Sequence, residues 1–222
     1  MGPMMQTLGK LTLPPRQIAG LAALILLLGA IAMACWPDAG DPNSPDPERR
    51  LQAVTNLKGR SDSEAVKTLV RLSRDSKPRV AVAAIKMIAA SPESSHTPLQ
   101  EILAAPDISP PARAEAAAAL GKCPKKNVPI TVLTQVLTSD ADAQVRAGAA
   151  RGLSRRRDPA ALKDLVGALE DPDARVRLWA ITAIGRTTAL RFDYDARVPP
   201  EKQRDKIRTI KATLTQRTSY NE

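Results

Sequence analysis

A short pattern recurs five times between residues 50 and 188 of this chain, at spacings of 31 to 33 residues. It approximates Val-Arg-x-x-Ala-Ala-x-x-Leu-Gly, and an alanine follows three residues after the Arg-like position in every copy. A fixed period of this length is typical of solenoids built from stacked helical hairpins. The Arg-like position falls at Arg50, Ala81, Arg113, Arg146 and Arg177. The sequence therefore predicts a repeat fold whose surface, rather than an active-site cleft, carries the function.

The composition favours helices over strands. Hydrophobic residues make up 43% of the chain, but Phe, Trp and Tyr together only 2%. The core must therefore consist of Ala, Leu, Val and Ile, and alternating runs of β-branched and aromatic residues are missing. We predict an all-α fold with two helices per repeat, in which the recurring alanine lets neighbouring helices approach closely. The second helix carries the pattern, and the first helices are expected at residues 63–74, 97–105, 128–138 and 159–169.

The apolar segment 18–36 contains no charged residue. As a helix its 19 residues would extend ~28 Å, close to the ~30 Å hydrocarbon thickness of a bilayer. A short basic segment, 1–17, precedes it with Lys10 and Arg16. This order predicts a transmembrane or signal-anchor helix with the N-terminus inside and the repeats extracytoplasmic.

Two other fates of this segment stay open. Ala32-Met33-Ala34 resembles a cleavage site for secretion, and Cys35 directly after it is a possible lipidation site of a lipoprotein. A retained anchor is the favoured interpretation, with a lipoprotein second. Basic residues are balanced between the two ends of the segment, so cytoplasmic repeats remain an alternative.

The remaining segments have distinct compositions. Residues 37–47 contain four prolines and predict a semi-extended linker between the membrane and the solenoid, which is expected at 48–190. The extension 191–222 departs from the repeat. Ile207, Ile210 and Leu214 form a narrow apolar stripe there, which predicts a helix that caps the last repeat.

Three repeats place an Asp six residues before the Arg: Asp107 with Arg113, Asp140 with Arg146, and Asp171 with Arg177. With this feature the chain resembles the HEAT-repeat family, in its short bacterial form, over residues 46 to 188. The resemblance implies a right-handed α-solenoid. It also implies that these Asp and Arg residues form a structural ladder of hydrogen bonds from unit to unit. The alternative interpretation is that the arginines form a row that binds anions.

The chain is basic, with 33 Lys and Arg against 23 Asp and Glu. The turns that leave the second helices are especially basic, whereas those that enter them are acidic. Compensation of helix dipoles accounts for these signs but not for three consecutive arginines. We therefore expect a contact edge for anionic lipid or for an acidic partner. It comprises Lys122, Lys125, Lys126, Arg155, Arg156 and Arg157.

The sequence offers no catalytic, cofactor-binding or metal-binding residues. A single histidine, His96, cannot support a site that needs several imidazoles, and no Gly-rich phosphate loop occurs. We predict a membrane-tethered scaffold, without a cofactor, that binds a protein partner through a concave face lined by second helices. Outward residues on that face are expected to include Gln52, Lys86, Arg151 and Thr182. A HEAT-like lyase or enzyme subunit is one alternative. Nucleic-acid binding is disfavoured because the repeats lack stacking aromatics.

Overall fold

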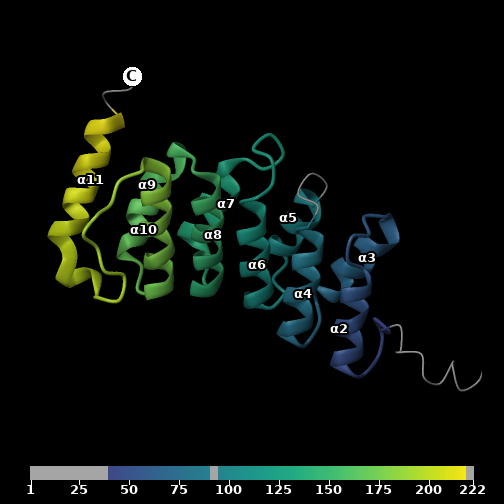
Figure 1. Ribbon diagram of the computed structural model, residues 1–222. Helices are drawn as coiled ribbons and strands as arrows, with labels where there is room; N and C mark the ends of the chain where they lie inside the picture. Colours follow the sequence, from purple (N-terminus) through teal and green to yellow (C-terminus); the bar gives the residue numbers. More distant parts are fainter. Residues whose placement is uncertain (1–39, 91–94, 219–222) are drawn as a thin grey trace, which may run out of the picture. The chain divides into compact units, whose positions relative to one another are not determined.

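The computed structural model describes residues 40–90 and 95–218, so Cys35 and the predicted segments 1–17 and 18–36 lie outside the described residues. In the described part every regular element is helical and none is a strand. The helices follow one another in chain order and form two rows (Figure 1). This confirms the prediction of an all-helical repeat solenoid. None of the helices described is both long and apolar enough to cross a membrane.

Each repeat supplies one helix to each row. The first helices are α3 (Ser63–Leu72), α5 (His96–Ala104), α7 (Ile130–Ser139) and α9 (Leu162–Gly167), the last flanked by the 3-10 turns η1 (Pro159–Ala161) and η2 (Ala168–Glu170). The second helices are α2 (Pro47–Asn56), α4 (Pro78–Ile88), α6 (Pro110–Leu120), α8 (Ala143–Arg156) and α10 (Ala174–Thr188). Because α2 has no first helix in the described residues, the solenoid starts with a half-repeat and continues with four pairs.

Local sequence accounts for the starts of four helices, α2, α3, α8 and α10. The carboxylates of Asp46, Asp62, Asp142 and Asp173 each accept a hydrogen bond from a backbone N–H in the first turn of the following helix. Gly185 lies within α10, which continues to Thr188 because burial of its neighbouring core residues outweighs the roughly 1 kcal/mol cost of an internal glycine.

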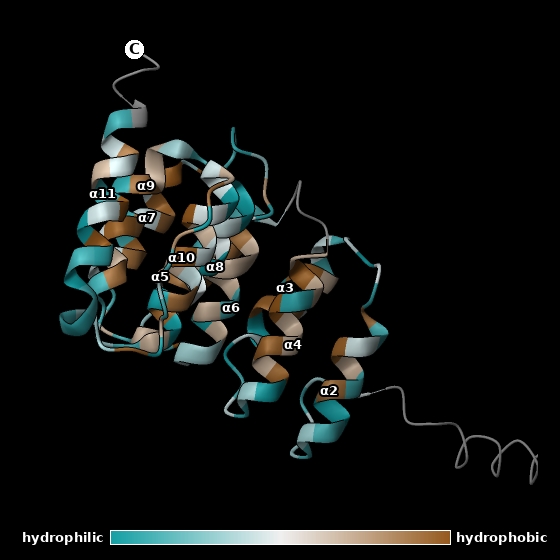
Figure 2. Ribbon diagram, turned by 60° about the vertical axis from the view of Figure 1, so that its left-hand side comes forward, coloured by the Kyte–Doolittle hydropathy of each residue, from teal (hydrophilic) through white to brown (hydrophobic). Residues whose placement is uncertain are grey.

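The second helices form the more closely packed row. Their recurring alanines, at positions 53, 84, 116, 149 and 180, are all at most 4% exposed. Helix α8 packs extensively against α6 and α10, whereas first helices touch one another much less. Closer stacking on one side bends a solenoid towards that side, so the second helices line its inner face. Figure 2 shows that the apolar residues lie mainly within the helices, whereas most connecting turns are hydrophilic.

The approach of α6 to α8 depends on glycines. A Cβ atom placed on Gly148 would lie 2.3 Å from the carbonyl oxygen of Ala114. One placed on Gly152 would lie 2.6 Å from the carbonyl oxygen of Ala117. Both distances are far below van der Waals contact and both involve backbone atoms, which cannot rotate away. The two helices therefore pack backbone to backbone at this step.

The C-terminal extension closes the row of first helices. After the 3-10 turn η3 (Pro200–Gln203), helix α11 (Arg204–Thr218) packs against α9 and buries Ile207, Ile210 and Leu214. The Tyr194 hydroxyl donates a hydrogen bond of 2.6 Å to the Leu169 carbonyl and so fixes the segment that leads to α11.

Residues 40–46, expected to be part of a linker, instead belong to the solenoid. Ser44 is only 5% exposed. Arg50 donates hydrogen bonds to the carbonyl oxygens of Ser44 at 2.8 Å and Pro45 at 3.0 Å, and Arg71 donates to the side chain of Asn43. The expectation considered only apolar burial, whereas it is the carbonyl groups of this turn that bind the first repeat.

Replacing Gly148 by alanine tests the close packing of α6 and α8. We expect Gly148→Ala to destabilise the chain by about 1–3 kcal/mol, because the added methyl forces two backbones apart. The matched control is Gly167→Ala in α9, where nothing lies within 4 Å of the added Cβ. The control should be neutral or stabilising by up to about 1 kcal/mol through helix propensity. Thermal denaturation followed by circular dichroism measures both, and equal midpoints for the two variants would contradict this packing.

Candidate functional site

Arg146, near the start of α8, joins two consecutive repeats. Its Nε and Nη2 atoms donate to the two carboxylate oxygens of Asp171 in the next repeat, at 2.8 and 3.0 Å. Its Nη1 atom donates to the backbone carbonyls of Asp140 at 2.9 Å and Ala141 at 3.1 Å, in the turn before its own helix. The hydrogen bond to Asp171 raises the pKa of Arg146. All three guanidinium nitrogens are thus engaged in holding turns together.

The same arrangement recurs along the solenoid with variations at its ends. Arg50 binds Asp75 in a bidentate pair, at 2.5 and 2.9 Å, and this bond lowers the pKa of Asp75. Arg113 binds Asp140 through Nη2. At the last repeat, Arg177 donates to the carbonyl of Ala196 from Nε at 3.0 Å and Nη2 at 2.7 Å. The C-terminal extension therefore supplies the acceptor that a further repeat would have supplied.

Three of these arginines, Arg50, Arg113 and Arg146, pair with the Asp of the following repeat, 25 to 27 residues ahead, and not with the Asp six residues before them. Within its own repeat, Arg146 reaches only backbone carbonyls. Arg177 does the same with the carbonyls of Asp171 and Pro172, at 2.7 and 2.8 Å, and is 4% exposed. With their donors engaged in this way, the geometry makes these arginines part of the architecture and leaves no open anion-binding row.

The ladder is interrupted where Ala81 replaces the arginine. Asp107, which would bind an arginine at that position, is paired instead with Arg74 from the end of α3, at 3.1 Å. The side chains of Arg74 and Asp107 are 42% and 61% exposed, whereas those of Arg146 and Asp171 are 14% and 9% exposed. Solvent screens an exposed pair, so the step from the second to the third repeat is held more weakly.

The six residues of the predicted basic edge do not form one surface. Arg156 is 7% exposed and donates to the carbonyls of Cys123, at 2.9 Å, and Val128, so it belongs to the interior. Burial lowers its pKa. Lys125 pairs with Asp158 at 3.2 Å. Arg157 ends α8 in the left-handed region with φ of 50°. Arg156 therefore points away from the exposed members of the predicted edge, because consecutive residues of a helix point in different directions.

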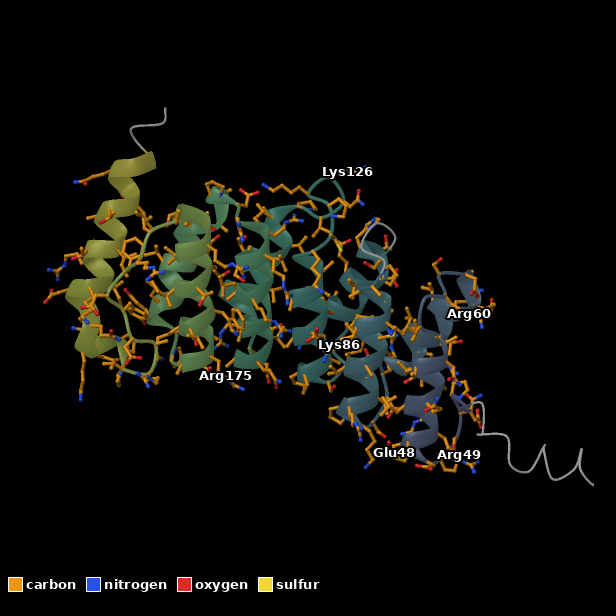
Figure 3. All side chains as sticks on the ribbon, in the orientation of Figure 1. Glu48, Arg49, Arg60, Lys86, Lys126 and Arg175 are labelled. Carbon is orange, nitrogen blue, oxygen red and sulfur yellow. The ribbon has the colours of Figure 1, made fainter. Side chains whose placement is uncertain are left out.

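The turns that leave and enter second helices lie at opposite edges of the solenoid. Figure 3 shows Arg60 and Lys126 at one edge, and Glu48, Arg49 and Arg175 at the other. Lys126 is exposed, as is Lys122, which precedes it in the same turn. Arg175 is paired with Asp173 at 2.9 Å, and the hydrogen bonds from Arg175 lower the pKa of Asp173 to about 2. Most of the charge at the entering edge is thereby neutralised locally.

The inner face of the solenoid carries a second group of cations that the edge hypothesis missed in part. The position five residues after the Arg-like position lies within the second helix, and the position nine residues after it lies near the end of that helix or in the turn that leaves it. From α4 to α10, lysine or arginine occupies five of these eight positions, and Ala90, Ala118 and Thr182 occupy the other three. We call this set the basic strip: Lys86, Lys122, Arg151, Arg155 and Arg186. At the corresponding positions of α2 stand the uncharged Thr55 and Gly59.

The basic strip is only partly neutralised. Arg151 of α8 pairs with Glu115 of α6 at 2.7 Å. Arg155 donates to the carbonyl of Ala118 at 2.5 Å, and its pKa is lowered by partial burial and by repulsion from Arg151 and Arg186. In the described residues the side chains of Lys86, Lys122 and Arg186 form no hydrogen bond or ion pair. Three helices thus bring several cations together around one carboxylate.

No metal or cofactor site emerges from the residues described. They contain no group of three His, Cys, Asp or Glu side chains placed to hold a metal ion. Cys123 is buried, and its Sγ lies 3.7 Å from Ser95 Oγ. Sequence inspection also missed an exposed apolar residue, Leu178 of α10, which is 52% exposed in a groove formed with Ile181 and Tyr194.

Replacing a ladder arginine by alanine should reduce the free energy of unfolding more than replacing Arg74, which takes over the pairing where the ladder is interrupted. We expect Arg146→Ala to destabilise the chain by about 2–3 kcal/mol, because it removes two of the three hydrogen bonds to the carboxylate of Asp171 and the side-chain donor to two backbone carbonyls. Arg74→Ala removes a solvent-exposed pair and should cost less than about 1 kcal/mol. Chemical denaturation of both variants measures the difference. Equal costs would show that the ladder does not hold the repeats together.

Two solved structures are similar to this chain in part. An engineered protein is 21% identical over 66% of this chain and 76% of its own, with a TM-score of 0.40. A designed armadillo repeat protein in complex with the peptide (KR)4 is 20% identical over 77% of this chain and 85% of its own, with a TM-score of 0.41. No curated protein matches. The family model for HEAT repeats matches residues 42–126 and 130–198, and the chain therefore belongs to the HEAT-repeat family.

Proposed function

We propose that this protein is a scaffold that binds another protein through the inner face of its solenoid. The observation that carries the proposal is the basic strip, where cations from consecutive second helices stand on one face with one carboxylate among them. Clustered like charges destabilise a fold, and here partial burial, together with repulsion from Arg151 and Arg186, lowers the pKa of Arg155. A partner that brings complementary charge to the strip would relieve this repulsion.

The scaffold beneath the strip is suited to presenting a fixed surface. Helices α6, α8 and α10 stack closely through small residues, and the arginine ladder fixes the turns between them. Side chains on rigid elements are positioned more precisely than those on loops, so less ordering is needed on binding. The strip lies over this closely packed part of the solenoid rather than over α2.

We further propose that the scaffold is tethered to a membrane by residues 18–36, with the repeats on the extracytoplasmic side. The support is the uncharged stretch of 19 apolar residues after a basic segment. Lipidation at Cys35 would give a different attachment with the same placement of the repeats. Only about three residues, 37–39, separate the apolar segment from the described solenoid, so the tether is short.

Site-specific photo-cross-linking tests the binding face. A cross-linker is placed at Lys86 or Thr182 on the inner face, and control cross-linkers are placed at the exposed Lys67 of α3 and Lys163 of α9. We expect a discrete adduct with the same protein from both inner positions and none from the controls. Adducts of equal yield from all four positions, or none from the inner pair in cells that make the protein, would reject the proposal.

A reporter fused after Glu222 tests the tether and its orientation. A periplasmic enzyme that is active only outside the cytoplasm should be active in this fusion, and the fusion should resist extraction from membranes by alkaline carbonate. The matched control replaces two apolar residues of the segment, Leu26→Arg and Leu27→Arg, and should abolish both properties. An active cytoplasmic reporter at the same position would reverse the proposed topology.

A further inference from the structure

We propose that the ligand of the basic strip is an acidic polypeptide segment in extended conformation, with an acidic side chain at every third residue. This rests on the proposed function, since it specifies which kind of protein segment the inner face binds. The observations that carry it are the pair of Arg151 with Glu115 at 2.7 Å and the position of the Arg155 guanidinium, which donates to the carbonyl of Ala118 and is repelled by both Arg151 and Arg186.

The spacing of the strip follows from the repeat. Lys122, Arg155 and Arg186 occupy the same position in three consecutive repeats. Equivalent residues of a solenoid are separated by the distance between stacked helices, which is about 8–10 Å. The backbone contact at Gly148 and Gly152 places the α6–α8 step at the short end of this range. The cations therefore recur at intervals of roughly 8–10 Å along the inner face.

An extended chain matches this interval when every third residue is acidic. A polyproline II helix rises about 3.1 Å per residue with three residues per turn, so every third side chain lies on one face about 9 Å apart. A β-strand alternates its faces, and same-face residues recur at about 6.8 Å. An α-helix would need acidic residues seven apart, at about 10.5 Å. Of the three conformations, polyproline II is the one whose same-face spacing falls within the roughly 8–10 Å interval of the cations, so each acidic residue can pair with one cation.

Two other polyanions, an anionic lipid bilayer and a single-stranded nucleic acid, fit the inner face less well than a polypeptide does. The strip lies on the inner side of the row of second helices, which a flat bilayer cannot follow. A single-stranded nucleic acid gains affinity from bases stacked on aromatic side chains, and along the second helices Trp179 alone could serve. Recognition by charge and spacing, with little stacking, favours a polypeptide.

Glu115 has a positioning role in this scheme. Its pair with Arg151 fixes that guanidinium beside Arg155 while no ligand is bound. An incoming carboxylate must compete with Glu115 for Arg151. Replacement by glutamine removes the competing charge and retains a similar shape, so ligand affinity should rise while the fold is kept.

Peptide binding to the full chain in neutral detergent tests the proposal. The probes are three labelled 13-residue peptides with five glutamates each among prolines and alanines, with glutamate at every third residue, at every second residue, or in one block. We expect the every-third peptide to bind about tenfold more tightly than the other two. The double variant Arg155→Gln, Arg186→Gln should lose about tenfold, and Glu115→Gln should gain up to about threefold.

The control variant Arg204→Gln, Arg208→Gln removes the same charge from the exposed surface of α11 and should bind as the parent does. Vesicles with anionic lipid and a single-stranded oligonucleotide are tested in parallel. Equal affinity for the three peptides, an equal loss in the α11 control, or binding that depends on the strip only with vesicles or oligonucleotide would overturn the inference. If the inner face still forms its cross-links in that case, the proposed scaffold function survives and only the ligand class is wrong.

Discussion

The close packing of second helices against one another is the constraint on which the rest of this structure depends. Alanine recurs at the contact in every repeat, and glycine takes over where α6 and α8 approach most closely. Because the second helices stack more closely than the first helices, the solenoid bends towards the second helices, which therefore line its inner face. It also sets the distance between equivalent residues in successive repeats, which determines how charges on that face are spaced.

The arginine ladder links consecutive repeats in one direction along the chain and ends differently at the last repeat. Arg50 and Arg146 each bind forward to the next repeat and to the turn before their own helix, and Arg113 also pairs forward, so the pairs link the repeats in one order. At the last repeat the carbonyl of Ala196 replaces the missing aspartate. At Ala81 the ladder is replaced by an exposed pair, and there the packing of α4 against α6 is also less extensive than that of α6 against α8. The N-terminal repeats are therefore the less firmly held part.

Much of the fold could be predicted from the sequence because a repeat reports the same physical requirement several times. The alanine three residues after the Arg-like position is buried in every copy, and one occurrence alone would have carried little information. The pairing of the ladder could not be obtained this way. An Asp and an Arg six residues apart suggest contact with each other, whereas the partner stands 25 to 27 residues away because stacking brings consecutive turns together.

The candidate binding surface was harder to predict for a related reason. Lys122 and Arg155 were grouped with Arg156 by their position in basic turns, yet Arg156 points inward and bonds to the carbonyls of Cys123 and Val128. Adjacent residues of a helix point about 100° apart, so a run of arginines does not form one patch. The exposed cations could have been found by aligning the repeats column by column, since Lys122, Arg155 and Arg186 then share one position.

Native-state hydrogen exchange tests most directly whether the stacked second helices hold the solenoid together. The slowest-exchanging amides should lie in α6, α8 and α10, with protection falling across the interrupted ladder to α4 and α2. Such a gradient is expected because each repeat is stabilised chiefly by its neighbours. Uniform protection from α2 to α10, or the greatest protection in the first helices, would contradict the account.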